Sequence, residues 1–140
     1  MGKMKVFLDT NVLIDYLNKR EPFFADASQV LDLCISGQVD GILSSLSIIN
    51  AVYIMRKAYT RESLLLKANW LTKQFKVSPV DKQIIEKAIA AQPTDFEDAV
   101  QYHSALQAKA DLIISRDTKG FAEFDLPVMT PAEFIARCAE

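Results

Sequence analysis

The sequence has few of the residues that several common kinds of site require. Of 140 residues, one is a histidine, two are cysteines and four are glycines. A mechanism that needs paired histidines is therefore excluded. Cys34 and Cys138 lie far apart, with no second pair to suggest a zinc site or a disulfide framework, and we expect reduced thiols. Neither the GxxxxGK[ST] nor the GxGxxG phosphate motif occurs, and there is no GxSxG nucleophile elbow.

Charge excess and long apolar runs are also absent. Sixteen basic and eighteen acidic residues give a formal net charge of −2, so no global positive field would gather nucleic acid. A nucleic-acid substrate would need a local basic rim or a bridging metal. No segment approaches the ~20 apolar residues that cross a bilayer, and no charged leader precedes an apolar run. We therefore expect a cytoplasmic protein.

The remaining pattern is that of one compact domain. Half of the residues are hydrophobic, which is enough for a buried core. Apolar strands are expected at 4–8, 39–43, 75–80, 111–115 and 126–129, and helices at 12–18, 23–35, 46–58, 61–74, 81–91, 94–109 and from 131. Short apolar strands alternating with helices predict a single three-layer α/β/α domain over residues 1–140, with a parallel sheet of about five strands. Residues 1–3 are expected to be an added or disordered leader.

Two helices are expected to be buried on a broad face. The segment 46–58 is apolar on nearly every side, which is typical of a helix surrounded by the core. The segment 61–74 should turn its large apolar side chains to the core, namely Leu64, Leu65, Leu66, Trp70 and Leu71. A dimer or partner surface is the alternative for Leu64, Leu65, Leu66 and Trp70.

Ligand sites in parallel sheets form beyond the carboxyl ends of the strands. Asp9 ends the first strand, Asp117 follows the fourth, and Asp98 lies near the start of the helix that leads into the fourth. Three carboxylates with few counter-charges would repel one another unless a cation neutralised them, and hard oxygen ligands suit Mg²⁺ or Mn²⁺. A helix N-cap is the structural alternative for Asp9, and a turn residue is the alternative for Asp117.

The stretch TDFEDAV, residues 94–100, holds three carboxylates. Thr94 and Glu97 match a capping box, which would make Glu97 structural and place it on a polar helix face with Gln101 and Ser104. Asp95 is either a neighbour of the cap or an outer member of the site. Asp98 lies at the edge of the apolar face, where it can reach the cleft. His103 falls on that apolar face and is expected to be a packed, hydrogen-bonded histidine rather than a ligand.

Four stretches, FLDTNVLID, SSLSIIN, DFEDAVQYHSA and LIISRDTKGF, resemble in sequence and order the PIN domain family, which includes the VapC-type toxins. The resemblance covers nearly the whole chain. It implies a metal-dependent endoribonuclease that uses Mg²⁺ or Mn²⁺, acts as the toxin of a type II toxin–antitoxin pair, forms a homodimer and binds a small antitoxin protein.

The resemblance also implies roles for single residues. Asp9, Asp98 and Asp117 would bind the metal, and Asn11 and Ser115 would steady the acids or the water around the metal.

Two positions depart from the family pattern. Asn50 stands where the family usually has a glutamate, and Gly120 stands where an additional acid often follows. Both changes should weaken metal binding. An amide oxygen can still serve a hard cation, so Asn50 is expected to act with the three aspartates in catalysis; a buried amide bonded to backbone is the alternative. Arg116 is either a solvated charge or a phosphate contact.

Two other functions compete with a nuclease. The loss of two acids could leave a catalytically weakened PIN domain that binds RNA or a partner protein. A phosphoryl-transfer domain of the receiver or haloacid-phosphatase type also places an aspartate at a strand end. Its second aspartate, two residues later, is replaced here by Asn11.

Overall fold

The computed structural model describes residues 2–139, so the expectation for residue 1 lies outside the described range. Gly2 and Lys3 are exposed and belong to no helix or strand. The strands are β1 (Lys5–Leu8), β2 (Asp40–Ser44), β3 (Lys76–Ser78), β4 (Leu112–Ile114) and β5 (Val128–Met129). The helices are α1 (Thr10–Leu17), α2 (Phe24–Ile35), α3 (Ser45–Met55), α4 (Arg61–Gln74), α5 (Lys82–Ala90), α6 (Phe96–Gln107) and α7 (Pro131–Cys138).

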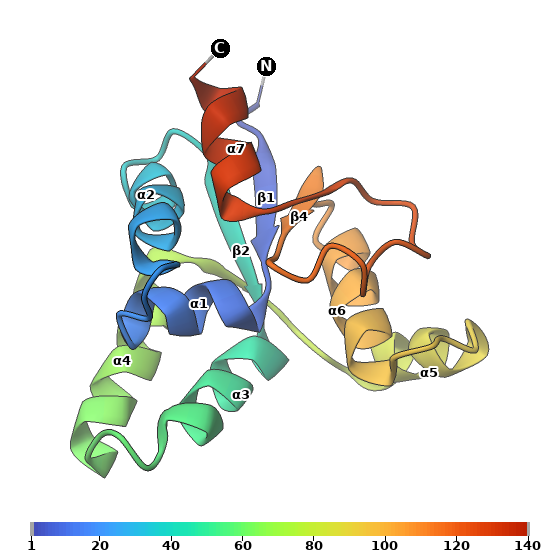
Figure 1. Ribbon diagram of the computed structural model, residues 1–140. Coiled ribbons are helices and arrows are strands. Elements are labelled where there is room, and N and C mark those ends of the chain that lie inside the picture. The colour runs from blue at the N-terminus through green and yellow to red at the C-terminus, as the bar shows by residue number, and fades with distance from the viewer. Residues whose placement is uncertain (1, 140) are drawn as a thin grey trace.

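All five strands run parallel in the order β3-β2-β1-β4-β5. Helices α1, α2 and α7 lie on one face of the sheet, and α5 and α6 lie on the other (Figure 1). Side chains of β1 alternate between two cores: Val6 and Leu8 pack with α1, α2 and α7, while Phe7 packs with α6. The predicted three-layer α/β/α fold is confirmed, with each strand boundary within three residues of its expected place.

Helices α3 and α4 extend past the carboxyl ends of the strands, below the sheet in Figure 1. The prediction that they are broadly buried was wrong. Leu64 and Leu71 are buried, as expected, but five large apolar side chains on these helices are at least half exposed: Ile49, Tyr53, Ile54, Leu65 and Leu66. The two helices pack on each other and on α1 through a small core around Ile14 and Met55. Ile48, Trp70 and Leu71 pack against the main core, as expected for Trp70 and Leu71. The five exposed side chains have no layer over them within residues 2–139.

Helix α6 is rotated relative to the expectation from its apolar residues. Gln101 and Ser104, expected on the polar face, are fully buried, whereas Phe96 and Leu106 are 49% and 42% exposed. Ala105 packs against the strand residues Phe7 and Ile113, whereas Ala99 packs against α5. No helix within residues 2–139 is long and apolar enough to cross a membrane.

Candidate active site at the carboxyl ends of β1 and β4

The register between β1 and β4 places two site residues side by side. Leu8 pairs with Ile114, so Asp9 and Ser115 are the next residues on neighbouring parallel strands. The Asp9 backbone N–H donates to the Ile114 carbonyl at 3.0 Å, and the Ser115 hydroxyl donates to Asp9 Oδ2 at 2.8 Å. Asp9 is also the N-cap of α1 and accepts from the Thr10 N–H. The N-cap that was the alternative for Asp9 is thus observed, on a carboxylate that also lies at the candidate site.

Asn11 links the two strand ends. Its Nδ2 donates to Ser115 Oγ at 3.1 Å and to Asp9 Oδ2 at 3.3 Å, and its Oδ1 accepts from the Arg116 N–H at 3.2 Å. Ser115 Oγ additionally accepts from the Asp117 N–H at 3.0 Å. Asn11 and Ser115 therefore fix the orientation of Asp9 and the start of the loop that carries Asp117.

The first turn of α6 brings Asp98 to the same edge. Asp95 is the N-cap of this helix, and its carboxylate accepts from the Asp98 N–H at 2.9 Å. A Cβ added at Gly120 would lie against carboxylate oxygens of both Asp98 and Asp117, so these two groups face one small space that a side chain at position 120 would fill. The Gly120 N–H donates to Asp117 Oδ1 at 3.0 Å, the local turn expected around Asp117.

Asn50 of α3 faces the acidic edge, which is the carboxyl end of the sheet with the carboxylates of Asp9, Asp95, Asp98 and Asp117. The alternative of a buried amide bonded to backbone was wrong, because Asn50 is only partly buried and its amide bonds to a side chain. Its Nδ2 donates to Glu97 Oε1 at 3.1 Å. The predicted capping box was also wrong: α6 begins one residue later than a Thr94 cap requires, Thr94 donates to Glu123, and Glu97 is directed to Asn50.

A buried polar network below the acids was not found from the sequence. Gln101 of α6 donates to Ser47 Oγ at 2.7 Å and accepts from the Ser44 hydroxyl at 2.6 Å. The Thr10 hydroxyl donates to Ser47 Oγ at 3.0 Å. These residues come from the first turn of α1, the end of β2, the start of α3 and α6, the elements that carry the acidic edge. One signal could have indicated the network: a serine or threonine occurs at each of two strand-to-helix junctions, Thr10 after β1 and Ser44 at the end of β2.

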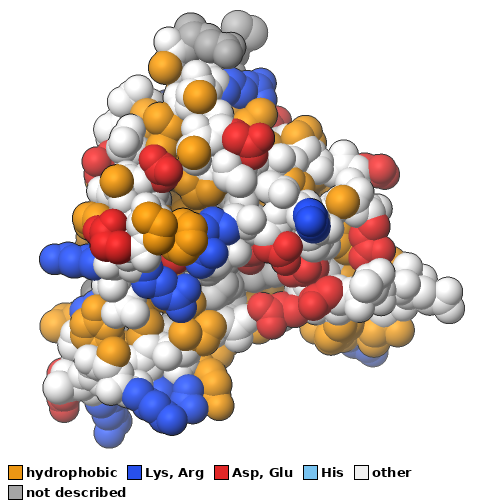
Figure 2. Space-filling model, viewed as in Figure 1, with side chains coloured by type: hydrophobic (Ala, Val, Ile, Leu, Met, Phe, Trp, Pro, Cys, Tyr) orange, Lys and Arg blue, Asp and Glu red, His pale blue; other side chains and the backbone are white. Residues whose placement is uncertain are grey.

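The electrostatics of the edge reflect burial and mutual repulsion. Burial raises the pKa of Asp9, although its hydrogen bonds from Ser115 and Thr10 act in the opposite direction. Burial, followed by the charges of Asp95, Asp9, Asp117 and Glu97, raises the pKa of Asp98 to about 7. Acidic side chains gather at the centre of the face shown in Figure 2, where α6 begins beside the β1–α1 junction. The edge thus carries more negative charge than its surroundings neutralise.

These donors suit a hard divalent cation. They are all oxygens, and Gly120 leaves open the space between Asp98 and Asp117. Within residues 2–139, however, no three histidine, cysteine or acidic side chains already converge as a metal ligand set. Asp9, Asp117 and Glu97 are held by hydrogen bonds to Ser115, Gly120 and Asn50. A cation would therefore have to draw the carboxylates together by side-chain rotation.

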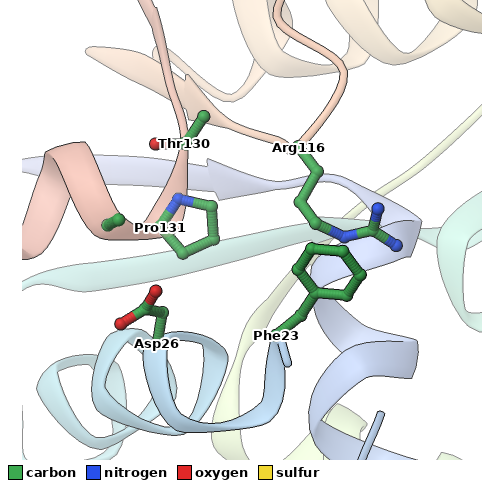
Figure 3. A pocket seen from close by; sticks show the side chains of 6 residues that line it. Phe23, Asp26, Arg116, Thr130 and Pro131 are labelled. Atoms are coloured by element: carbon green, nitrogen blue, oxygen red, sulfur yellow. The ribbon is translucent and has the colours of Figure 1, made fainter. Parts of the chain in front are cut away.

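Arg116 follows Ser115 but its side chain turns away from the acids. Its Nε and Nη2 donate to the fully buried Asp15 at 2.6 and 3.2 Å, and its guanidinium lies 4.0 Å from the Phe23 ring centroid. Figure 3 shows this stack at one side of a cavity of about 350 Å³, with Asp26 and Pro131 on the other side. The Asp15 carboxylate thus neutralises much of the positive charge of Arg116 that would otherwise attract a phosphate group.

His103 packs edge-on against Tyr102, with ring centroids 5.0 Å apart. Its buried Nε2 has no hydrogen-bond partner among the described residues, contrary to the expectation of a bonded histidine. Burial, with the charge of Lys87, lowers its pKa.

Together, the parallel sheet and the acids at its carboxyl edge define an α/β domain with a cluster of carboxylates at its strand ends. The family model of the PIN domain matches residues 5–119, and the chain belongs to this family. The predicted family resemblance is therefore confirmed, and the receiver and phosphatase alternatives have no support.

Individual relatives agree with this assignment. The chain is 29% identical to ribonuclease VapC1 of Aquifex aeolicus over an alignment 142 residues long, which covers 98% of this chain and 97% of that protein. Its fold resembles that of a toxin–antitoxin complex from Klebsiella pneumoniae, with a TM-score of 0.69, 22% identity, and coverage of 90% of this chain and 97% of that one. It also resembles VapC20 of Mycobacterium tuberculosis, described as a Sarcin-Ricin loop cleaving toxin, with a TM-score of 0.69, 15% identity, and coverage of 84% and 94%.

Proposed function

We propose that this protein is a metal-dependent endoribonuclease that hydrolyses RNA phosphodiester bonds and serves as the toxin of a type II toxin–antitoxin pair. The observation that carries the proposal is the small space that Asp98 and Asp117 share beside Gly120, at the same sheet edge where Asp9 follows β1, in a chain of the PIN family. The similarity to a named ribonuclease along nearly the whole chain supports RNA as the substrate.

Asp9, Asp98 and Asp117 would hold Mg²⁺ or Mn²⁺, with the Asn50 amide oxygen as a neutral donor beside them. A cation held by these residues would supply an activated water for the hydrolysis and would offset charge on the phosphoryl oxygens. The expected products carry a 5′-phosphate and a 3′-hydroxyl.

The surrounding residues position these donors. Ser115 and Asn11 both donate to Asp9 Oδ2, which holds the carboxylate in one orientation and favours its charged form. Asp95 is an outer member of the site because it fixes the first turn of α6 through the Asp98 N–H. Arg116 suits a positioning role better than a phosphate contact, because its guanidinium anchors the loop of Asp117 to buried Asp15.

A replacement of Asp98 tests the assignment of the site. Asp98→Asn keeps the side-chain shape and leaves the Asp95 cap in place, so the domain should fold while metal-dependent RNA cleavage is lost. Circular dichroism checks the fold, and cleavage of a labelled RNA with Mn²⁺ or EDTA measures activity. If the variant cuts RNA as fast as the parent, the assignment of the site is wrong.

A small antitoxin and a second copy of the chain are the proposed protein partners, and the proposed location is the cytoplasm. Two solved toxin–antitoxin complexes with the same fold support an antitoxin. The exposed apolar side chains of α3 and α4 form a surface that suits protein contacts, namely Ile49, Tyr53, Ile54, Leu65 and Leu66.

A catalytically weak PIN domain that binds RNA or a partner is the second candidate. It is favoured by Asn50 at a position where the family usually has an acid, and by the absence of a converged ligand set among residues 2–139. Calorimetric titration with Mn²⁺ separates the two candidates. Binding below millimolar Mn²⁺ would support the nuclease, and no binding at millimolar Mn²⁺ would support the second candidate.

A further inference from the structure

The acidic edge contains one more carboxylate, that of Glu97, besides the three proposed ligands and the helix cap Asp95. Glu97 lies in the first turn of α6, next to Asp98 in sequence. With Asp95 as the N-cap, Asp98 is at the third helical position, from which a capping-box side chain would reach back, and Glu97 is one position too early for that role. The Glu97 side chain instead crosses to α3 and accepts from Asn50 Nδ2 at 3.1 Å. Its orientation therefore comes from the residue that stands in for the missing acid.

The location of the Glu97 carboxylate matters because residue 50, where the family usually has a glutamate, is here an uncharged asparagine. The Asn50–Glu97 hydrogen bond joins that position to the start of α6, so the Glu97 carboxylate lies within one hydrogen bond of the place where an acid at position 50 would act. Its charge also acts on the two neighbouring acids, since Glu97 contributes to the raised pKa values of both Asp9 and Asp98. Glu97 thus belongs to the acidic edge by geometry and by charge.

We propose that Glu97, oriented by the Asn50 amide, supplies the fourth carboxylate of the divalent-cation site in place of the acid absent from position 50. The inference rests on the proposed function, because it adds a ligand to the same site. Asn50 then has two tasks: its Nδ2 holds Glu97, and its Oδ1 is free to serve the cation or its water. The amide does not repel Glu97, as a second carboxylate at position 50 would.

Glu62 provides a matched control for the charge itself. Like Glu97, it is an exposed glutamate in the first turn of its helix, here α4. Replacing either residue with glutamine removes one negative charge from a helix N-terminus, so a difference between the variants cannot come from the helix dipole or from net charge.

Calorimetric titration with MnCl₂, supported by the thermal shift that Mn²⁺ produces, tests the proposal. Removing a ligand carboxylate should cost at least the ~10-fold typical of outer-shell partners, so Glu97→Gln should weaken Mn²⁺ binding ~10-fold or more and reduce the thermal shift. Glu62→Gln should bind like the parent. Moving the acid, in the double variant Glu97→Gln with Asn50→Glu, should restore most of the affinity.

Two results would overturn the proposal. The first is Mn²⁺ affinity of Glu97→Gln equal to that of the parent. The second is a loss in Glu97→Gln that the double variant does not recover, which would attribute the loss to a local change in α6 rather than to a missing ligand. Asp9→Asn separates this failure from failure of the proposed function. If Asp9→Asn loses binding while Glu97→Gln keeps it, only the role of Glu97 is wrong; if both bind like the parent, the cation site itself is wrong.

Discussion

Replacing Asp98 with asparagine should remove activity and yet stabilise the metal-free protein at pH 8. The pKa of Asp98 is raised from 3.8 to about 7 in the folded state, mainly by burial. The folded chain therefore keeps this proton between about pH 4 and 7 while the unfolded chain loses it, so stability falls as pH rises through that range. Asparagine carries no titratable proton, so the stability of the Asp98→Asn variant does not fall in this way as the pH rises.

The size of the effect follows from the same shift. A pKa change from 3.8 to about 7 corresponds to at most ~4 kcal/mol of unfolding free energy. Asp98 is only partly buried, so solvent screens much of this, and a negative charge in the first turn of α6 gains ~0.3–1 kcal/mol from the helix dipole. We expect Asp98→Asn to be ~1–2 kcal/mol more stable than the parent at pH 8 and about equal to it at pH 4.

Urea denaturation in EDTA at pH 4 and pH 8, followed by circular dichroism, measures this difference. Adding Mn²⁺ at pH 8 should reverse the order, because a ligand at 100 times its Kd stabilises the parent by ~2.7 kcal/mol and the variant by less. Asp32→Asn, which removes an exposed carboxylate from α2, is the control for the loss of one negative charge. A stability difference for Asp98→Asn that is the same at both pH values would refute the reasoning.

Three further substitutions test other parts of the site. Gln101→Leu leaves the buried hydroxyls of Ser44 and Ser47 without their amide partner, and urea denaturation should show a loss of ~2–3 kcal/mol. Arg116→Met leaves the buried Asp15 carboxylate with only the weaker Arg20 contact at 3.6 Å, and the same assay should show a loss of ~2–3 kcal/mol. Gly120→Ala places a methyl group against Asp98 and Asp117, and calorimetry should show Mn²⁺ binding weakened ~10-fold with little change in stability.

Each of these predictions has its own contradicting result. Gln107→Leu changes an exposed glutamine at the end of the same helix, so equal losses for Gln101→Leu and Gln107→Leu would deny the network a role. An Arg116→Met variant as stable as the parent would mean that Arg20 alone compensates Asp15. Parental Mn²⁺ affinity in Gly120→Ala would mean that the cation does not lie between the two aspartates.

The sheet could be predicted from the sequence because its signals are local and consistent. Each strand is a short apolar run, and each is followed by a helical pattern, so parallel pairing with both faces covered is the expected solution. The same rule placed Asp9 and Ser115 at the carboxyl edge, and the register of β1 with β4 puts them side by side.

The errors arose where apolar content was taken as burial. Helix α3 is apolar on nearly every side, but it extends beyond the sheet and only one side is packed, which leaves Ile49 and Tyr53 exposed. In α6 the buried face includes Gln101, because polar side chains from the end of β2 and the start of α1 form hydrogen bonds with it. Such pairing depends on residues 57 and 91 positions away in the chain, so no local pattern reveals it.

The role of residues 94–98 could not be settled for a similar reason. Thr94 and Glu97 have the spacing of a capping box, yet Asp95 is an equally good cap one residue later. The choice between them depends on what lies opposite Glu97. In the fold that residue is Asn50, 47 positions earlier in the chain.

The proposed function depends most on a cation held by aspartates at the strand ends. The most direct test is an RNA cleavage assay on the parent and Asp9→Asn proteins, each with EDTA and with added Mn²⁺. We expect the parent to cut RNA only with Mn²⁺ and Asp9→Asn to be inactive under both conditions while remaining folded. Cleavage by the parent in EDTA, or Mn²⁺-dependent cleavage by Asp9→Asn at the parental rate, would contradict the account.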